Sequence, residues 1–276
     1  MFKSITELTE KELAGKKVLL RVDFNVPVTD GKISEFYRID AIKETLGYLA
    51  GRGAVLSLVS HIIAISSFES ILDQIKKPLR YDLIFIKDWL NTDSYSILNN
   101  GKPGDIFLLD NIRQYEGEEK NDSDFAKKIA EIFDIYVNDA FSVCHRNHAS
   151  ISAITKFLPS YAGLRLIKEI ENLNKTMKSP KEGKTLILGG AKIETKFPVI
   201  KNFLNKAENI LIGGAIANIF FKAKGVDIKK SLTDNNFLED AKNLLKEKNL
   251  IIPDDYVVSG DMILDIGEKT ADSFVE

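Results

Sequence analysis

The strongest constraint on the fold is an alternation of short apolar runs with segments of helical period. Buried parallel strands take the form of such runs, because helices cover both faces of a parallel sheet. In chain order the runs are "KVLLRVDF", "AVLSLVS", "LIFIKDW", "DIFLLDN", "IYVND", "TLILGG", "NILIGGA" and "LIIPDDYVV". The alternation predicts an α/β protein whose strands are mainly parallel.

Apolar residues between these runs recur at the spacing of a helix face. The first series stops before Gly51 and Gly53, which suit the end of a helix. The three clearest series are Ile39, Ile42, Leu46, Leu49; then Phe125, Ile129, Ile132, Phe133; and then Phe237, Leu238, Ala241, Leu244, Leu245. Each series predicts a helix that packs on a sheet.

A long charged stretch separates two groups of runs. Residues 158–184 open with Pro159, continue at helical spacing and end in a cluster of Pro, Gly and Lys. This composition predicts a helix that joins two domains. We expect a first domain over residues 1–160, an interdomain helix and hinge over 161–182, and a second domain over 183–276.

The composition favours a small-molecule ligand. The chain has 276 residues and a net charge of −2, so it lacks a general basic field that would attract nucleic acid or a membrane surface. Its single cysteine excludes an internal disulfide framework. The start lacks the apolar core of a signal peptide, and no stretch approaches the roughly 18 apolar residues of a membrane span. We expect a cytoplasmic protein without nucleic-acid or membrane partners.

Polar residues follow several predicted strands. In "RVDFNVP" an apolar strand leads to Asp23 and Asn25, and in "LLDNIR" a strand leads to Arg113. Ligands of open α/β sheets bind at the carboxyl ends of the strands, so these side chains are candidates for holding substrate. An alternative is that Asp23 and Asn25 only organise a turn.

Arg38, Arg113 and Arg146 all lie near predicted strand ends or helix starts. The planar guanidinium forms paired hydrogen bonds with phosphate or carboxylate, so convergence of these residues would make a clamp for a small anion. Each arginine taken alone is better explained as a solvated or salt-bridged surface residue, and the sequence does not show that the three converge.

Two strands of the second domain end in paired glycines, followed in the first case by lysines. The pairs are Gly189 with Gly190 and Gly213 with Gly214. Glycines let a phosphate approach the backbone, a helix N-terminus offers free amides, and Lys192 and Lys196 add charge. The pattern is neither of the standard glycine-rich phosphate motifs, so a plain strand-to-helix turn stays open beside a nucleotide site.

The segment "NDAFSVCHRNHASI", residues 138–151, contains Cys144, His145 and His148 around Arg146. Adjacent residues rarely ligate one zinc ion together, and no second cluster completes four ligands. A Cys/His nucleophile is also disfavoured, because sequence neighbours point apart. An anion clamp through Arg146 needs neither arrangement, and we predict no metal site.

Together these motifs resemble the phosphoglycerate kinase family. The motifs that carry the resemblance occur in the family's order over nearly the whole chain: "LLRVDFNVPV", "YRIDAI", "PGDIFLLDNIRQYEGEEKND", "YVNDAFSVCHRNHASI", "LGGAKIETK", "NILIGGAIANIFFKAKG" and "IIPDDYVV". The resemblance implies two Rossmann-like domains with parallel sheets, the second of them incomplete relative to the family. The first would bind phosphoglycerate and the second the nucleotide.

The implied function is that of a glycolytic kinase, which moves a phosphoryl group reversibly between 1,3-bisphosphoglycerate and ADP to give 3-phosphoglycerate and ATP, with Mg²⁺ carried by the nucleotide. The positions that match the family's substrate residues are Asp23, Asn25, Arg38, His61, Arg113 and Arg146. Those that match its nucleotide loops are Gly189, Gly190, Ala191, Lys192, Lys196, Gly213 and Gly214. Arg38, Lys192 and Lys196 are the expected catalytic residues, and the domains are expected to close about residues 158–184.

Two departures from the family matter. In "SHIIAIS" Ala64 stands where the family has an arginine, and one lost charged contact is worth on the order of 1.5–3 kcal/mol. The family's later nucleotide loops would also lie beyond Glu276. The alternatives to an active kinase are therefore a degenerate binding protein, a split enzyme that needs a complementing chain, or self-association through an uncovered sheet in the second domain.

Overall fold

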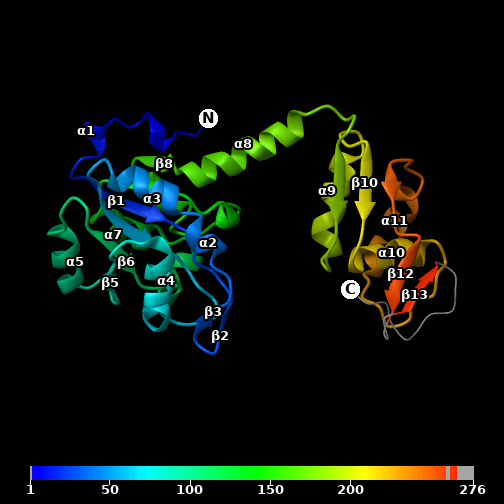
Figure 1. Ribbon diagram of the computed structural model, residues 1–276, viewed down its shortest axis with the longest axis horizontal. Helices are drawn as coiled ribbons and strands as arrows, with labels where there is room; N and C mark the ends of the chain where they lie inside the picture. Colours follow the sequence, from blue (N-terminus) through cyan, green and yellow to red (C-terminus); the bar gives the residue numbers. More distant parts are fainter. Residues whose placement is uncertain (1, 259–261, 266–276) are drawn as a thin grey trace. The chain divides into compact units, whose positions relative to one another are not determined.

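The computed structural model describes residues 2–258 and 262–265. The chain forms two compact units, unit 1 (Met1–Leu173) and unit 2 (Asn174–Glu276). Figure 1 shows an α/β arrangement in each, with helices packed on a sheet. The α/β class and the parallel sheets predicted from the sequence are confirmed.

Unit 1 contains a six-stranded sheet in the order β5-β6-β4-β1-β7-β8, and every pairing in it is parallel. Its strands are β1 (Lys17–Arg21), β4 (Val55–Val59), β5 (Ile84–Ile86), β6 (Ile106–Leu109), β7 (Ile135–Asn138) and β8 (Ser160–Ala162). A small antiparallel hairpin joins β2 (Val28–Thr29) to β3 (Lys32–Ile33). Because the strands of the large sheet are parallel, their carboxyl ends meet at one edge.

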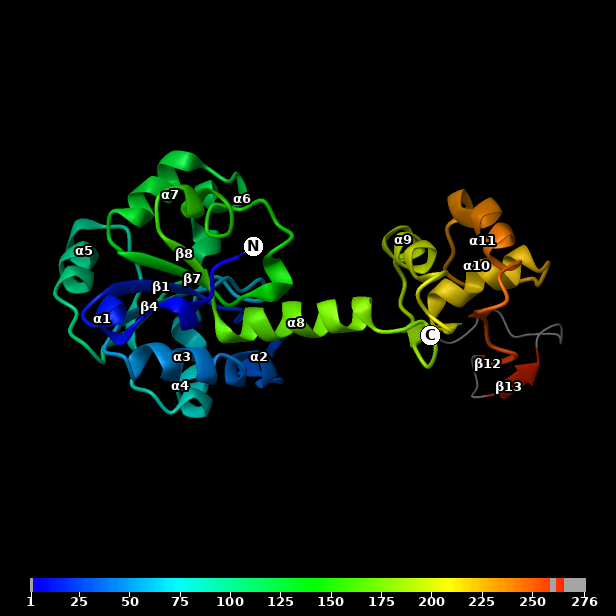
Figure 2. The ribbon, with the colours of Figure 1, turned by 90° about the horizontal axis from the view of Figure 1, so that it is seen from above.

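Helices cover both faces of this sheet, as Figure 2 shows with α3 and α4 on one side and α5 and α7 on the other. Successive side chains of β1 point to opposite faces of the sheet. Val18 and Leu20 pack in the apolar core on one face, and Leu19 packs in the core on the other. The helices are α1 (Glu10–Leu13), α2 (Tyr37–Asp40), α3 (Lys43–Ala50), α4 (Leu72–Leu79), α5 (Thr92–Asn99), α6 (Glu116–Glu119) and α7 (Ser123–Ala130). Helical turns are η1 (Ile5–Glu7), η2 (Phe68–Ile71), η3 (Ile112–Gln114), η4 (Phe141–Val143) and η5 (Ala153–Lys156).

The charged stretch after unit 1's sheet forms α8 (Leu164–Lys178), which begins later than Pro159. The residues before it pair with β7 as strand β8. Two tertiary contacts fix the start of the helix: the Leu166 amide donates to Asp139 Oδ1 at 3.1 Å, and the Leu164 amide donates to Thr45 Oγ1 at 3.1 Å. The first turn therefore takes its caps from distant residues.

Unit 2 has a three-stranded parallel sheet in the order β11-β10-β9. Its elements are β9 (Thr185–Leu188), α9 (Ile193–Phe203), β10 (Asn209–Ile212), α10 (Ala215–Ala223), η6 (Asn235–Phe237), α11 (Leu238–Leu244) and β11 (Leu250–Ile251). Apolar residues of α9, α10 and α11 pack with β10 in one core.

One strand prediction is wrong. The run "LIIPDDYVV" forms two strands, because Pro253 cannot donate to a ladder and separates β11 from β12 (Asp255–Val258). β12 pairs antiparallel with β13 (Met262–Asp265). Among the residues that the structure describes, no helix is long and apolar enough to cross a membrane.

Candidate functional site

The candidate substrate residues of unit 1 lie at the carboxyl edge of its sheet. Asp23 follows β1, His61 follows β4 and Arg113 lies in η3 just after β6. Arg38 is in α2, and Arg146 comes after η4, which follows β7. Strands that are far apart in the sequence therefore deliver these side chains to one edge, as the rule for open parallel sheets leads one to expect.

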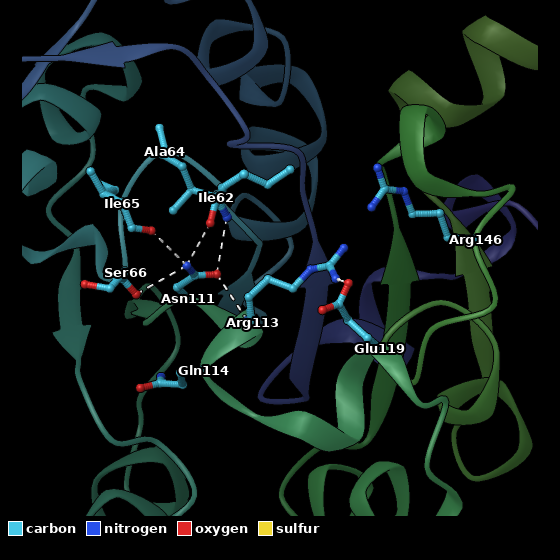
Figure 3. A pocket seen from close by; sticks show the side chains of 10 residues that line it. Ile62, Ala64, Ile65, Ser66, Asn111, Arg113, Gln114, Glu119 and Arg146 are labelled. Carbon is cyan, nitrogen blue, oxygen red and sulfur yellow. Dashed lines mark hydrogen bonds and ion pairs between the residues drawn. The ribbon is translucent and has the colours of Figure 1, made fainter.

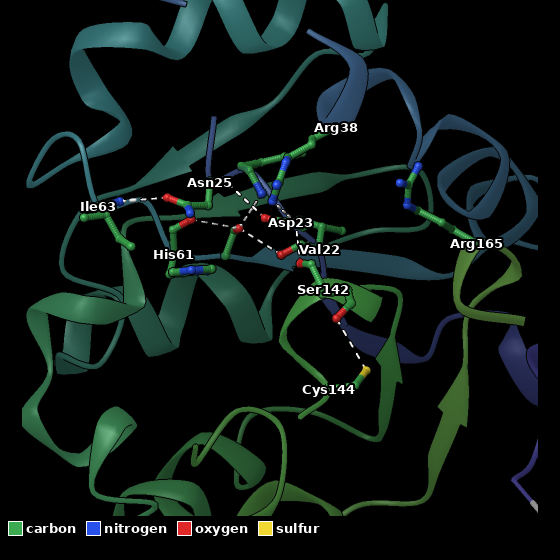
Figure 4. A network of polar contacts seen from close by, with 12 residues as sticks. Val22, Asp23, Asn25, Arg38, His61, Ile63, Ser142, Cys144 and Arg165 are labelled. Carbon is green, nitrogen blue, oxygen red and sulfur yellow. Dashed lines mark hydrogen bonds and ion pairs between the residues drawn. The ribbon is translucent and has the colours of Figure 1, made fainter. Parts of the chain in front are cut away.

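Asp23 is the centre of a polar cluster (Figure 4). Its Oδ2 accepts from the Arg38 guanidinium and from the Ser142 hydroxyl, the latter at 2.5 Å. Its Oδ1 accepts from the Asn25 amide at 3.1 Å, and Asn25 Oδ1 in turn accepts from the Ile63 amide at 3.0 Å. Asp23 and Asn25 thus organise a turn and also hold Arg38 and the β4 loop, so the two interpretations of this pair are compatible.

A cavity of about 320 Å³ adjoins this cluster. It is lined by Asp23, Val26, Pro27, Glu35, Tyr37, Arg38, Phe141, Ser142, Arg165 and Glu169. Arg165 comes from α8; its guanidinium lies 3.5 Å from Glu169 and 5.2 Å from the centre of the Tyr37 ring. The cavity therefore contains Arg38 with a second arginine that the sequence analysis did not single out.

Arg113 and Arg146 line a larger cavity of about 610 Å³ (Figure 3). The Arg113 guanidinium pairs with Glu119, while its buried Nε has no hydrogen-bond partner among the described residues. Burial lowers the pKa of Arg113, and the charge of Arg146 lowers it further. Two guanidinium groups that repel one another beside an open cavity favour an anion between or beside them.

The opposite wall of this cavity is the apolar loop 62–65, whose backbone is hydrogen-bonded to the side chain of Asn111. Asn111 Oδ1 accepts from the Ile62 amide at 3.2 Å, and its Nδ2 donates to the carbonyls of Ile62 at 2.9 Å and Ile65 at 3.3 Å. The loop thereby places Ala64 in the cavity lining. The position that the family resemblance associates with an arginine contributes only a methyl group here.

His61 is buried beneath these arginines. Burial lowers its pKa to about 3, and the positive charges of Arg21, Arg113 and Arg146 act in the same direction, whereas Asp23 acts against it. The imidazole is therefore neutral at ordinary pH. It can therefore bind an anionic oxygen only by donating its ring N–H, not as a cation.

The cysteine and histidines of residues 138–151 do not converge. Cys144 Sγ accepts from Asn138 Nδ2 at 3.4 Å and donates to the Ala140 carbonyl at 3.4 Å, and burial raises the pKa of the thiol. His148 Nδ1 lies 3.9 Å from Glu118. In the part of the chain that the structure describes, no group of three or more His, Cys, Asp or Glu side chains is placed to hold a metal.

In unit 2 the paired glycines bring two strand ends into contact. Gly190 and Gly214 have φ values of +102° and +57°, and a Cβ on Gly214 would lie 2.9 Å from the Gly190 amide nitrogen. Gly189 lies beside Gly213, where a Cβ on Gly189 would make only an ordinary contact, 3.8 Å from the Gly213 carbonyl. A larger residue at Gly214 would separate the two loops, so Gly190 and Gly214 are the two positions at which the backbone requires glycine.

A cavity of about 170 Å³ lies at the start of α9. Its lining residues are Ala191, Lys192, Ile193, Glu194, Leu232, Thr233 and Asp234. Lys192 is the N-cap residue, and Thr233 Oγ1 is buried without a partner among the described residues. A cation, a free hydroxyl and a helix N-terminus fit the polar groups of a nucleotide. Lys196 is half-buried on α9, outside this lining.

Sequence reasoning missed several residues of the site. Arg21 could have been noticed as a charged residue in an otherwise apolar strand. Ser142 and Glu119 carry no local signal, because their importance depends on contacts with Asp23 and Arg113 from distant parts of the chain. Arg165 gave no separate signal because α8 contains many charged residues.

Comparisons with known proteins agree with this geometry. A family model described as phosphoglycerate kinase matches residues 8–276. A phosphoglycerate kinase of Dictyoglomus turgidum is 38% identical, with 99% of this chain and 77% of the relative covered. A phosphoglycerate kinase of Pseudothermotoga lettingae is 40% identical over 95% of this chain and 69% of the relative.

Solved structures give the same result. The phosphoglycerate kinase of Coxiella burnetii superposes with a TM-score of 0.79 at 30% identity, covering 99% of this chain and 74% of that one. The phosphoglycerate kinase of Pyrococcus horikoshii superposes with a TM-score of 0.88 at 26% identity, covering all of this chain and 74% of that one. By both sequence and structure, this chain belongs to the phosphoglycerate kinase family.

Proposed function

We propose that this chain catalyses reversible phosphoryl transfer between 1,3-bisphosphoglycerate and ADP, giving 3-phosphoglycerate and ATP. The observation that carries the proposal is the gathering of Asp23, Arg38, Arg113 and Arg146 at one edge of the sheet in unit 1. A small molecule with a phosphate, a hydroxyl and a carboxyl group matches such a mixture of guanidinium groups and a carboxylate acceptor.

In this proposal each domain binds one substrate. Residues 1–160 hold the phosphoglycerate through Asp23, Asn25, Arg38, His61, Arg113 and Arg146. Residues 183–276 hold the nucleotide through Gly189, Gly190, Ala191, Lys192, Lys196, Gly213 and Gly214. Residues 161–182 join the domains, and their closure about residues 158–184 stays a prediction. We also infer that the enzyme works in the cytoplasm.

For phosphoryl transfer the protein has to position the two substrates and place positive charge near the migrating group. Phosphoryl transfer needs no covalent nucleophile from the protein, because the acyl phosphate and the nucleotide react directly. Arg38, Lys192 and Lys196 would stabilise the charge on the migrating group. Mg²⁺ bound to the nucleotide would neutralise part of the charge on its phosphates.

A coupled assay with 3-phosphoglycerate, ATP and Mg²⁺ tests the function. We expect turnover by the full chain, and a loss of about 100-fold or more in kcat for Arg38→Ala and for Lys196→Ala, as removal of one charged transition-state contact commonly gives. Lys201→Ala is the matched control, because Lys201 lies on the same helix and pairs with Asp240 at the surface. Turnover by the wild type no faster than by Arg38→Ala would refute the function.

Binding of phosphoglycerate without turnover is a second candidate. It is favoured by Ala64, which leaves one wall of the arginine-lined cavity apolar. Calorimetry with 3-phosphoglycerate separates the two functions: heat of binding without turnover supports the second, and no heat with either 3-phosphoglycerate or ADP excludes it.

Association through unit 2 is also supported by one observation. Ile187 is 74% exposed and Ile251 44% exposed, and both lie beside Leu211 on neighbouring strands, so one row crosses the face of the small sheet. An exposed apolar row of this kind favours contact with a second copy or a complementing chain. Sedimentation of the wild type and of Ile187→Ser measures self-association, and the coupled assay repeated with candidate complementing chains measures complementation.

A further inference from the structure

Arg21 is a fully buried arginine for which the proposed reaction gives no role. It is the last residue of β1 and is 1% exposed. Its Nε donates to Ser150 Oγ at 3.1 Å, and the Ser150 hydroxyl donates to Glu118 Oε1 at 2.7 Å. Glu118 is itself 0% exposed, and its Oε2 accepts from the Ser150 amide at 2.8 Å. A buried guanidinium held in this way has its orientation fixed.

The other end of the Arg21 guanidinium faces His61. Nη1 donates to the Val22 carbonyl and lies 3.5 Å from Ser60 Oγ, and Nη2 lies 3.1 Å from His61 Nδ1. A guanidinium has five donors and no acceptor, so Nδ1 must be the acceptor of this hydrogen bond. The ring proton of a neutral His61 is therefore on Nε2.

The Nε2–H of His61 is an unused donor. The atom is buried and has no partner among the described residues, although leaving a buried donor unpaired costs about 1–3 kcal/mol. The charged groups around the ring are Arg21, Arg113, Arg146 and Asp23. Apart from Arg21, these are the residues that we assign to the phosphoglycerate site, so an oxygen atom bound there is the natural acceptor.

We propose that Arg21 is a positioning residue that holds His61 as the neutral Nε2–H tautomer, and that this N–H donates a hydrogen bond to a phosphoglycerate oxygen. The second half rests on the proposed function, whereas the first concerns the free protein. Without Arg21 the ring could take the other tautomer, and the lone pair on Nε2 would then repel an anionic oxygen. Ser150 and Glu118 fix the orientation of Arg21 through the hydrogen bond from Arg21 Nε to Ser150 Oγ.

Nuclear magnetic resonance of the ¹⁵N-labelled full chain tests the first half. The chain has only three histidines, and His61→Gln assigns the His61 signals by their absence. We expect a single ring proton on Nε2 at pH 7, unchanged at pH 5. A proton on Nδ1, or on both nitrogens at pH 7, would overturn the proposal.

The role of Arg21 is tested by replacing it without leaving a buried carboxylate unpaired. In Arg21→Met/Glu118→Gln we expect a mixture of His61 tautomers, whereas the control Glu118→Gln keeps Nε2–H alone. Retention of the single tautomer in the double variant would contradict the role of Arg21. If the double variant does not fold, the resonance experiment on the wild type decides the role of Arg21, because a proton on His61 Nδ1 is incompatible with the hydrogen bond from Arg21 Nη2.

A matched pair of substitutions at His61 tests the second half. The side-chain amide of glutamine reaches the position of Nε2, and that of asparagine reaches only the position of Nδ1. We expect His61→Gln to bind 3-phosphoglycerate within about 3-fold of the wild type, and His61→Asn to bind about 10-fold more weakly. Equal weakening in both, or tighter binding by His61→Asn, would refute the donor role.

Failure of the proposed function gives a different result. If the wild type releases no heat with 3-phosphoglycerate, both that function and the donor role of His61 fall. The resonance experiment still decides whether Arg21 sets the tautomer, because it uses the free protein.

Discussion

The Ser142 hydroxyl donates a hydrogen bond to Asp23 Oδ2 over 2.5 Å, although the two residues are 119 positions apart in the sequence. Because Arg38 donates to the same oxygen, the carboxylate holds together the loop after β1, helix α2 and the helical turn η4 that follows β7. The shape of the proposed substrate site therefore depends on Asp23.

Loss of the Ser142 hydroxyl is expected to weaken the site modestly. A hydrogen bond to a charged carboxylate contributes about 1.5–3 kcal/mol, and because this one lies within the protein only part of the loss reaches the substrate, so Ser142→Ala should raise KM for 3-phosphoglycerate about 5-fold. Steady-state kinetics measure the effect. Ser152→Ala is the control, since its side chain provides no cap hydrogen bond; an equal change in both variants would mean that the contact with Asp23 has no specific role.

We expect Glu119 to compete with the proposed substrate for Arg113. The carboxylate pairs with the Arg113 guanidinium and is 64% exposed, whereas the arginine is mostly buried. Glu119→Gln should free Arg113 and tighten phosphoglycerate binding by about 3- to 10-fold at low salt. Calorimetry of this variant beside Glu116→Gln, whose pair with Lys120 lies on the surface, provides the comparison. Weaker binding by Glu119→Gln would show that the pair supports the site instead.

His61 should make folding stability depend on pH. Its pKa falls from 6.5 to about 3 in the folded chain, so below pH 6.5 the unfolded chain binds a proton that the folded chain does not. The stabilisation is present above pH 6.5 and is lost as the pH falls toward 3. Between pH 7 and pH 4 this amounts to about 3 kcal/mol.

Denaturant unfolding at several pH values measures the contribution of His61. Removal of the imidazole in His61→Gln should reduce the pH dependence of the free energy of unfolding between pH 7 and pH 4. Equal slopes for wild type and His61→Gln would show that the buried ring does not titrate abnormally.

Gly214 combines a left-handed backbone with a close approach. Gly214→Ala would place a Cβ 2.9 Å from the Gly190 amide nitrogen, so it should lower stability and weaken ADP binding. Gly225→Ala is a matched control for the backbone alone, because Gly225 has φ +88° with nothing within 4 Å. That control should cost about 1–2 kcal/mol and leave ADP affinity unchanged. An equal loss of ADP affinity in both variants would show that the close contact between Gly214 and Gly190 has no specific role in nucleotide binding.

The sequence predicted the fold class well because a parallel sheet imposes a local pattern. Strands such as "KVLLRVDF" are apolar on both faces, and this is visible without tertiary information. The first residue of α8 was harder to predict from the sequence. Leu164 and Leu166 take their caps from Thr45 and Asp139, and no local pattern encodes such distant contacts.

The candidate site was predictable in its residue types but not in its geometry. The motifs placed Asp23 and the arginines at strand ends, yet the pairing of Arg113 with Glu119 depends on how two segments meet in space. The same holds for Arg21, whose burial and contact with His61 Nδ1 emerge only when β1 and β4 lie side by side.

Calorimetric titration of the full chain with 3-phosphoglycerate tests the central claim that the arginines of unit 1 form its binding site. We predict saturable binding by the wild type and by Arg80→Met, whose arginine lies outside both cavities of the site. Arg146→Met should bind about 10-fold more weakly or not at all, because a guanidinium contact with an anion is lost. No binding by the wild type, or equal affinity in Arg146→Met and Arg80→Met, would contradict the account.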